Sequence, residues 1–264
     1  MHNLRLKQTL GQNFLRDKNV AKKIVKHISV DKNSTIMEVG PGDGAITGLL
    51  IEKFKNVIAI EIDNRFADFI KEKYSNFQNF IIICDDFTKI DLKKFYKKYG
   101  KLTIVGNIPY NITSSVLFKS FENRKYINCL YVMVQKEVGD RILSQNKTKK
   151  RGILSVLSQY YSEVKSLFLV SRNVFYPIPK VNSIFLKFDF YENPQPKLKD
   201  EGLFRNIIKL TFGKRRKLMK NSLKDLKEVD VNSICEIFDL NRRPEELTVT
   251  EFVKLTNLIY RKIC

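Results

Sequence analysis

Short apolar segments alternate with amphipathic helical patterns over the first two-thirds of the chain, and this alternation constrains the fold most. Two intervening segments, Ala45–Phe54 and Arg65–Tyr74, carry apolar residues at helical spacing. Strands that alternate with helices predict an α/β fold in which a parallel sheet has helices on both faces. The apolar runs that predict its strands are Ile36–Val39, Val57–Ile60, Phe80–Ile83, Leu102–Val105 and Leu130–Val134.

The composition changes near residue 192, which predicts a second, smaller domain. Leu167–Val170 and Ile184–Phe188 are expected to be antiparallel strands at the edge of the sheet. The following segment, Tyr191–Glu201, is polar, contains two prolines and has the character of a linker. Beyond it, Leu203–Lys262 is helical in pattern. We therefore expect domains at about residues 1–192 and 200–264, the second of them all-helical.

A glycine-rich turn follows the first predicted strand and precedes a helix. It comprises Glu38–Gly44, and Gly40, Gly42 and Ala45 match the spacing of a dinucleotide-binding turn. Such a turn brings backbone N–H groups close to a ligand. Glu61 ends the next strand, where a carboxylate can accept both hydroxyls of a ribose. These features predict a nucleoside-bearing cofactor and leave NAD and S-adenosylmethionine both open.

Polar residues also follow the third and fourth predicted strands. Asp86 could accept a hydrogen bond from an adenine amino group, with Phe87 against the ring, or could cap the next helix. The fourth strand ends in Gly106–Tyr110, where the Asn107 amide oxygen and the Pro109 carbonyl can accept both hydrogens of an exocyclic amine. Tyr110 offers a face for stacking. Acceptors around an amine keep its lone pair available for a methyl group on a sulfonium, without a metal, so the combination favours S-adenosylmethionine.

The chain is strongly basic, with 48 Lys and Arg against 28 Asp and Glu and a formal charge of +20. A polyanionic partner such as nucleic acid explains this charge. An anionic membrane surface is a second candidate partner, and a genome whose base composition favours Lys codons would give the same charge without any partner. Leu203–Lys224 carries eight basic residues and no acidic one, which predicts a helix with a cationic face. The four cysteines are far apart and no apolar run is long enough to span a membrane, so a cytoplasmic protein is expected.

These motifs resemble those of the ribosomal RNA adenine N6-dimethyltransferases over nearly the whole chain. The family's opening motif stands here as Gly11–Leu15, its acidic glycine loop as Glu38–Gly44 and its Asn-(Leu/Ile)-Pro-Tyr motif as Asn107–Tyr110. A later Phe-x-Pro-x-Pro-Lys-Val-(Asp/Asn)-Ser motif stands as Phe175–Ser183. The resemblance implies a Rossmann-like methyltransferase domain that binds S-adenosylmethionine.

The resemblance also implies roles for individual residues. The target adenine would stack between Tyr110 and Phe175, next to Asn107 and Pro109. Cofactor contacts are expected from Asn13, Leu15, Glu38, Gly40, Gly42, Glu61, Asp86 and Asn107. RNA contacts are expected from Arg141, Lys180, Lys214, Arg215, Arg216, Lys217 and Lys220.

Within the family, the chain resembles the small-subunit type more than the large-subunit resistance type at Gln135–Val138, Asp140–Ile142, Phe212–Lys217, Asn221–Leu223 and Arg242–Leu247. This branch implies dimethylation of two adjacent adenosines in a hairpin loop near the 3′ end of 16S rRNA. The substrate would be the immature small ribosomal subunit and the enzyme a monomer. The chain departs from the usual pattern at Asp85, where Gly or Gln is commoner, and at Tyr176, where Thr or His is frequent.

Two other functions remain compatible with parts of the pattern. A nucleic-acid binder without activity could use the same scaffold, although the intact strand-end residues argue against a loss of activity. A DNA adenine methyltransferase would usually have Pro-Pro-Tyr or Pro-Pro-Trp in place of Ile108–Tyr110.

Overall fold

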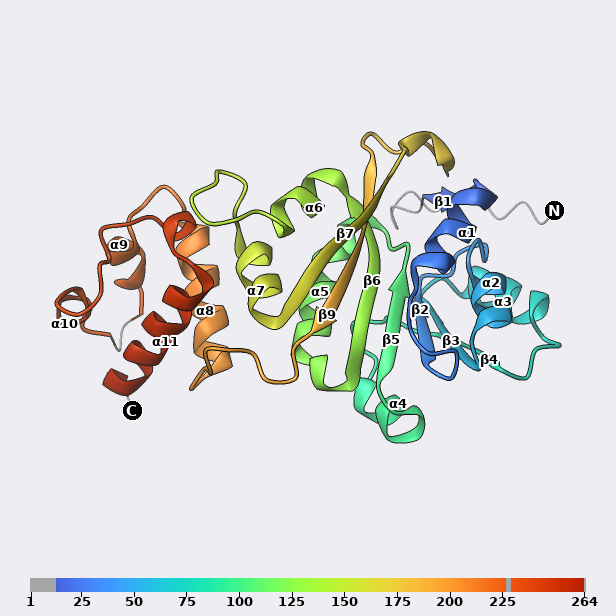
Figure 1. Ribbon diagram of the computed structural model, residues 1–264, viewed down its shortest axis with the longest axis horizontal. Coiled ribbons are helices and arrows are strands. Elements are labelled where there is room, and N and C mark those ends of the chain that lie inside the picture. Colours follow the sequence, from blue (N-terminus) through green and yellow to red (C-terminus); the bar gives the residue numbers. More distant parts are fainter. Residues whose placement is uncertain (1–12, 227–228, 264) are drawn as a thin grey trace. The chain divides into compact units, whose positions relative to one another are not determined.

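The computed structural model describes residues 13–226 and 229–263, which form two compact units (Figure 1). The first unit comprises the chain up to Gly139 together with Val164–Phe190, and the second comprises Asp140–Glu163 together with the chain from Tyr191. The expected division at residues 192–200 therefore omits one segment, because residues 140–163 cluster with the C-terminal helices. Within the described ranges, no helix is both long and apolar enough to cross a membrane.

A seven-stranded sheet forms the centre of the first unit, in the order β4-β3-β2-β5-β6-β9-β7. The strands from β4 to β6 are parallel neighbours, and β9 joins β6 in antiparallel register. Their bounds are Thr35–Val39 for β2, Asn56–Glu61 for β3, Phe80–Cys84 for β4, Leu102–Gly106 for β5, Ile127–Gln135 for β6, Ser162–Val170 for β7 and Ser183–Phe190 for β9. The predicted strands and the parallel sheet are confirmed.

The expectation that both late strands lie at the edge is wrong for β9. This strand lies between β6 and β7, and only β7 is at the edge. The side chains from Ser183 to Leu186 are all buried, as are those from Cys129 to Val134 on β6. A strand that is apolar on both faces needs neighbours and covering layers on each side, which an edge position does not provide.

Helices cover both faces of the sheet, and aspartates begin several of them. The Asp17 carboxylate accepts hydrogen bonds from the N–H groups of Asn19 and Val20, and Asp63 accepts one from Arg65. Such side-chain caps satisfy N–H groups that the helix itself leaves unpaired. The helices of this unit are α1 (Lys18–His27), α2 (Thr47–Lys53), α3 (Asn64–Lys73), α4 (Leu92–Tyr99) and α5 (Thr113–Glu122), and α6 (Lys136–Ile142) runs into the second unit.

A small second sheet pairs the start of the described chain with a late segment. Strand β1 (Phe14–Leu15) lies antiparallel to β8 (Phe175–Tyr176), with Phe14 opposite Tyr176 and Leu15 opposite Phe175. The Arg16 N–H donates to the Val174 carbonyl and extends the pairing by one residue. This pairing brings together two motifs that are 160 residues apart in the sequence.

The second unit is helical, as expected, and Phe204, Ile208, Phe252 and Ile259 are buried in its core. Leu203–Lys224 is not one continuous helix, because α8 ends at Gly213 and α9 begins only at Met219. The five basic residues predicted to bind RNA here, from Lys214 to Lys220, therefore lie in and just after this turn. The helices are α7 (Ile153–Tyr161), α8 (Glu201–Gly213), α9 (Met219–Leu223), α10 (Val231–Cys235) and α11 (Val249–Ile263).

Candidate active site

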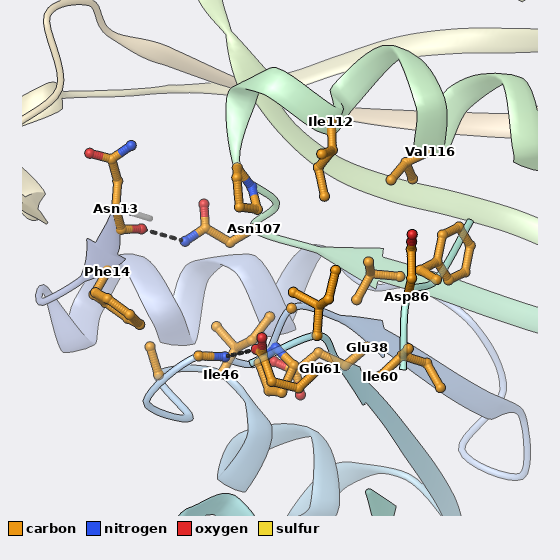
Figure 2. A pocket seen from close by; sticks show the side chains of 18 of the residues that line it. Asn13, Phe14, Glu38, Ile46, Ile60, Glu61, Asp86, Asn107, Ile112 and Val116 are labelled. Atoms are coloured by element: carbon orange, nitrogen blue, oxygen red, sulfur yellow. Dashed lines mark hydrogen bonds between the residues drawn. The ribbon is translucent and has the colours of Figure 1, made fainter. Parts of the chain in front are cut away.

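A cavity of about 270 Å³ opens where the parallel strands β2, β3, β4 and β5 end (Figure 2). The chain runs from β2 toward β4 on one side and returns to β5 on the other, so the cavity lies at the point where the strand order reverses. Ligands of open parallel sheets bind at this position. All eight predicted cofactor residues line it: Asn13, Leu15, Glu38, Gly40, Gly42, Glu61, Asp86 and Asn107. Gly11 and Gln12 of the opening motif lie outside the described residues.

The glycine loop after β2 has backbone φ angles that residues with a side chain rarely adopt. Gly40 and Gly42 have φ angles of +68° and +54°, in the left-handed region that favours glycine. A Cβ on Gly42 would lie 2.6 Å from the Phe14 ring, so the absence of a side chain lets β1 approach the loop. The Phe14 ring itself lines the cavity. The loop and β1 thus form one wall.

Glu61, at the end of β3, has both carboxylate oxygens hydrogen-bonded to backbone N–H groups. Its Oε2 accepts from Gly42 at 3.1 Å and its Oε1 from Asp63 at 3.0 Å. Burial raises the pKa of this carboxyl, and the two backbone donors oppose the rise. The N–H groups fix the carboxylate at the cavity wall, which is the placement needed to accept the hydroxyls of a ribose.

Glu38, near the end of β2, is more deeply enclosed, with only 1% of its surface exposed. Burial raises the pKa of the Glu38 carboxyl to about 8; the neighbouring Thr47 hydroxyl opposes the rise and the nearby Glu61 adds to it. Its Oε2 has no hydrogen-bond partner among the described residues. A buried acceptor of this kind favours a ligand that brings a donor or a positive charge.

Asp86, after β4, is held by a local turn. Its Oδ1 accepts hydrogen bonds from the N–H and the hydroxyl of Thr88, at 2.9 and 2.8 Å. The alternative in which Asp86 caps the next helix is wrong, because Asp91 is the N-cap of α4. One oxygen of Asp86 instead stabilises the turn, and the residue lines the cavity beside the buried ring of Phe87.

Asn107, after β5, is oriented by the opening motif. Its Nδ2 donates to the Asn13 carbonyl at 3.4 Å, which directs Oδ1 away from Asn13 (Figure 2). Pro109 also lines the cavity, and its carbonyl accepts the Ile112 N–H at 3.2 Å. A carbonyl oxygen has two lone pairs, so one acceptor position on Pro109 remains.

The described residues that line the cavity do not include Tyr110 or Phe175. The Tyr110 hydroxyl is hydrogen-bonded to the Ser183 Oγ at 2.7 Å, and burial raises the pKa of this phenol. Phe175 is 3% exposed and belongs to the apolar core opposite Leu15. In this arrangement a base cannot stack on Phe175, because the ring is covered by protein.

The residues predicted to bind RNA lie in both units. Lys180 is exposed in the first unit, and the other six belong to the second. Several of these six also have partners inside the unit. Lys214 forms an ion pair with Asp225, and Arg215 bonds to the Lys149 carbonyl and lies 3.8 Å from Glu245. Arg141 is exposed on α6.

Sequence reasoning missed part of the cavity wall. The apolar residues Ile46, Ile60 and Ile62 form part of the wall. Asn111 and Ile112 contribute from the turn before α5, and Ser115 and Val116 from its first turn. Ile60 and Ile62 flank Glu61 in the sequence, so the prediction that Glu61 lines a ligand site could have been extended to these two neighbours. Among the described residues, no cluster of three or more His, Cys, Asp or Glu side chains could hold a metal ion.

Together, the sheet order, the glycine loop and the carboxylates at the strand ends define a Rossmann-like methyltransferase that uses S-adenosylmethionine. Two solved structures share the fold. A dimethyladenosine transferase from Plasmodium falciparum has a TM-score of 0.79 at 24% identity, covering 94% of this chain and 98% of that one. The 23S rRNA methyltransferase ErmE has a TM-score of 0.68 at 22% identity, covering 94% and 99%.

The sequence comparison is more specific. The profile of the family described as ribosomal RNA adenine dimethylase matches residues 3–260. Proteins named ribosomal RNA small subunit methyltransferase A from Clostridium acetobutylicum and Fusobacterium nucleatum are each 38% identical to the chain. The alignments cover 98% and 96% of this chain and 96% and 97% of those proteins. The chain belongs to the ribosomal RNA adenine dimethylase family and is a methyltransferase that acts on rRNA adenines.

Proposed function

We propose that this enzyme dimethylates N6 of two adjacent adenosines in a hairpin loop near the 3′ end of 16S rRNA. The names of its relatives, which are small-subunit methyltransferases, support this choice of substrate. The observation that carries the reaction type is the convergence of Glu38, Glu61, Asp86 and Asn107 on one cavity. Carboxyl and amide oxygens at these positions can accept the hydrogen bonds that the hydroxyl and amino groups of a nucleoside donate.

The residues of the cavity fit S-adenosylmethionine. Gly40 leaves open space where a Cβ would lie, and Glu38 offers a buried acceptor without a protein partner among the described residues. Glu61 would hold the ribose, and Asp86 with Phe87 would hold the adenine. When bound, S-adenosylmethionine supplies a methyl group made electrophilic by its sulfonium.

Asn107 and Pro109 are proposed to activate the target amine. The Asn107 Oδ1 and the Pro109 carbonyl accept the two N–H hydrogens, which opposes conjugation of the nitrogen lone pair with the purine ring. The lone pair kept available by Asn107 and Pro109 would then form a bond to the methyl carbon that S-adenosylmethionine supplies. The sulfur would keep the electron pair of the broken S–C bond as a thioether, and the surplus N–H proton would pass to solvent water. Fixed dipoles that match charge developing in the transition state are the main source of catalysis here.

The target base must leave its stack to reach Asn107, which is least costly in a single-stranded loop. We propose that Tyr110 and Phe175 then hold it, at roughly 1–3 kcal/mol per stacked base. Because Phe175 is buried, this step requires the Phe175 side chain to turn out of the apolar core as the base enters. A second methyl transfer to the same nitrogen requires exchange of the cofactor.

Basic residues outside the cavity are proposed to bind the RNA backbone. Lys and Arg neutralise phosphates without reading the sequence, which suits the turn between α8 and α9. We assign Lys214, Arg215, Arg216, Lys217 and Lys220 to this role, together with Arg141 and Lys180. The proposed partner is the immature small subunit, on which the enzyme acts as a monomer in the cytoplasm.

Labelled methyl transfer tests the substrate. We expect transfer from S-adenosylmethionine to immature small subunits or naked 16S rRNA, two modified adjacent adenosines by primer extension, and no transfer to large subunits. Transfer to large subunits alone would overturn the proposal in favour of an activity like that named for ErmE.

A further inference from the structure

The most exposed aromatic side chain in the described part of the protein lies beside the active site. Tyr176 is 59% exposed and lies on β8, directly opposite Phe14 on β1. Opposite residues of an antiparallel pair point to the same face and lie about 5 Å apart. Since the Phe14 ring lines the cavity, the exposed Tyr176 ring is one residue away from the cavity wall.

A cation connects this ring to the glycine loop. The guanidinium carbon of Arg16 is 5.8 Å from the centre of the Phe14 ring and 5.9 Å from that of Tyr176. Its NH1 also forms an ion pair with Asp43 at 2.8 Å, and Asp43 lines the cavity. The Arg16 side chain is still 56% exposed, so the ion pair leaves it accessible to a phosphate.

The chain on either side of Tyr176 carries one further exposed apolar residue and two exposed cations. Ile178 is 60% exposed, and Lys180 and Arg172 are both exposed. The Arg172 NH1 donates to the Lys180 carbonyl, which holds the Arg172 guanidinium beside the backbone of Lys180. An uncovered ring among cations is the arrangement by which proteins stack single-stranded bases and neutralise their phosphates.

We propose that Tyr176 and Arg16 form a platform that stacks a nucleotide next to the target adenosine of the rRNA. The inference rests on the proposed function and extends it to a second base. Tyr176 lies outside the cavity that Asn107 and Pro109 line, so the base on Tyr176 is a neighbour of the one that is methylated. Arg16 binds the phosphate of that neighbouring nucleotide. Its ion pair with Asp43 holds the Arg16 side chain beside the glycine loop.

The test compares Tyr176→Ala, which removes the ring, with Tyr176→Phe, which keeps it. Binding of a fluorescent hairpin RNA from the 3′ end of 16S rRNA is measured by anisotropy. We expect Tyr176→Ala to weaken binding about 5- to 100-fold, whereas Tyr176→Phe stays within about twofold. Tyr96→Ala is the matched control, because Tyr96 is an exposed tyrosine on α4 of the same unit. Cofactor affinity, measured by calorimetry, should be the same in Tyr176→Ala and wild type.

A fluorescent base reports stacking directly. With 2-aminopurine placed on either side of the target adenosine, wild-type protein and Tyr176→Phe should quench one of the two positions, and Tyr176→Ala should not. Unchanged affinity and quenching in Tyr176→Ala would overturn the platform, as would an equal loss in Tyr176→Phe. Weaker binding to subunits with unchanged binding to naked RNA would also overturn it and indicate a protein contact. If wild-type enzyme binds the hairpin but methylates neither immature small subunits nor 16S rRNA, the proposed function fails, while anisotropy and quenching still decide the platform.

Discussion

The site has two halves, and they differ in how many of their proposed ligand-binding residues already line the cavity in the free protein. The cofactor half comprises Glu38, Gly40, Gly42, Glu61 and Asp86, all of which line the cavity. Their positions are fixed by parallel strands whose ends are in register, since Val39 lies opposite both Ile60 and Gly106. This half is ready to bind its ligand without a change in the backbone.

The acceptor half comprises Asn107, Pro109, Tyr110 and Phe175, and only the first two line the cavity. The two aromatic residues are held by other contacts, Tyr110 by the Ser183 hydroxyl and Phe175 by the apolar core. From this difference we infer that the cofactor binds to preorganised residues. The residues of the acceptor half rearrange only when the RNA base enters.

Asn107→Ala should give the largest effect, because it removes the acceptor where the two halves meet. We expect kcat for methyl transfer to fall roughly 10²- to 10³-fold, the usual loss for one fixed dipole at a reacting centre. RNA affinity should change by less than about threefold. Single-turnover transfer and filter binding measure the two quantities. Asn123→Ala, at the end of α5 in the same unit, serves as the control, and a wild-type kcat in Asn107→Ala would remove Asn107 from the mechanism.

The cofactor half could be predicted from sequence because its residues follow local rules. Glycines and carboxylates that directly follow strands must converge when the strands are parallel, so the order along the chain is sufficient. The same rule placed Asn107 correctly. Its partner Asn13 lies 94 positions away, and only the resemblance to the family brought the opening motif to the cavity.

What could not be predicted depends on contacts between distant segments. The burial of Phe175 follows from the pairing of β8 with β1, which no local pattern reveals. The membership of residues 140–163 in the helical unit depends on packing of α7 with α8 and α11, far along the chain. By contrast, the interior position of β9 had a signal in Ser183–Leu186, whose small and apolar side chains suit burial on both faces.

Glu61→Ala tests whether the cofactor half acts through affinity. We expect the dissociation constant for S-adenosylmethionine to rise about 10- to 100-fold, since hydrogen bonds to a charged group contribute about 1.5–3 kcal/mol. Glu61→Gln should give a smaller rise because one acceptor oxygen remains. Calorimetry measures both, and Glu52→Ala on the exposed side of α2 is the control. A lower kcat at saturating cofactor with an unchanged dissociation constant would assign Glu61 to the chemistry instead.

Glu38 makes the stability of the folded protein depend on pH. Its pKa is raised from 4.5 to about 8, so the folded protein keeps a proton that the unfolded chain loses. The free energy of unfolding is therefore highest below pH 4.5 with respect to this group. It falls by up to about 1.4 kcal/mol per pH unit until pH 8, where the folded state also ionises.

Glu38→Gln removes this titration and should flatten the decline in stability between pH 5 and 8. Urea unfolding at several pH values measures it, with Glu52→Gln as the control for loss of an exposed carboxylate. An equal pH dependence in wild type and Glu38→Gln would mean that Glu38 is ionised in the folded protein and has a partner.

Tyr110→Phe should give the smallest effect and sharpens the description of the acceptor half. The substitution removes the hydrogen bond to the Ser183 hydroxyl, which is fully buried, so we expect a loss of about 1 kcal/mol in stability. The ring remains, and kcat should stay within about threefold. Tyr99→Phe, on α4, controls for loss of a phenol elsewhere in the unit. If Tyr110→Phe lowered kcat as strongly as Asn107→Ala, the hydroxyl itself would act on the target amine. The Tyr110 hydroxyl would then have to break its hydrogen bond to the Ser183 Oγ and form a new one to the target amine when the base enters.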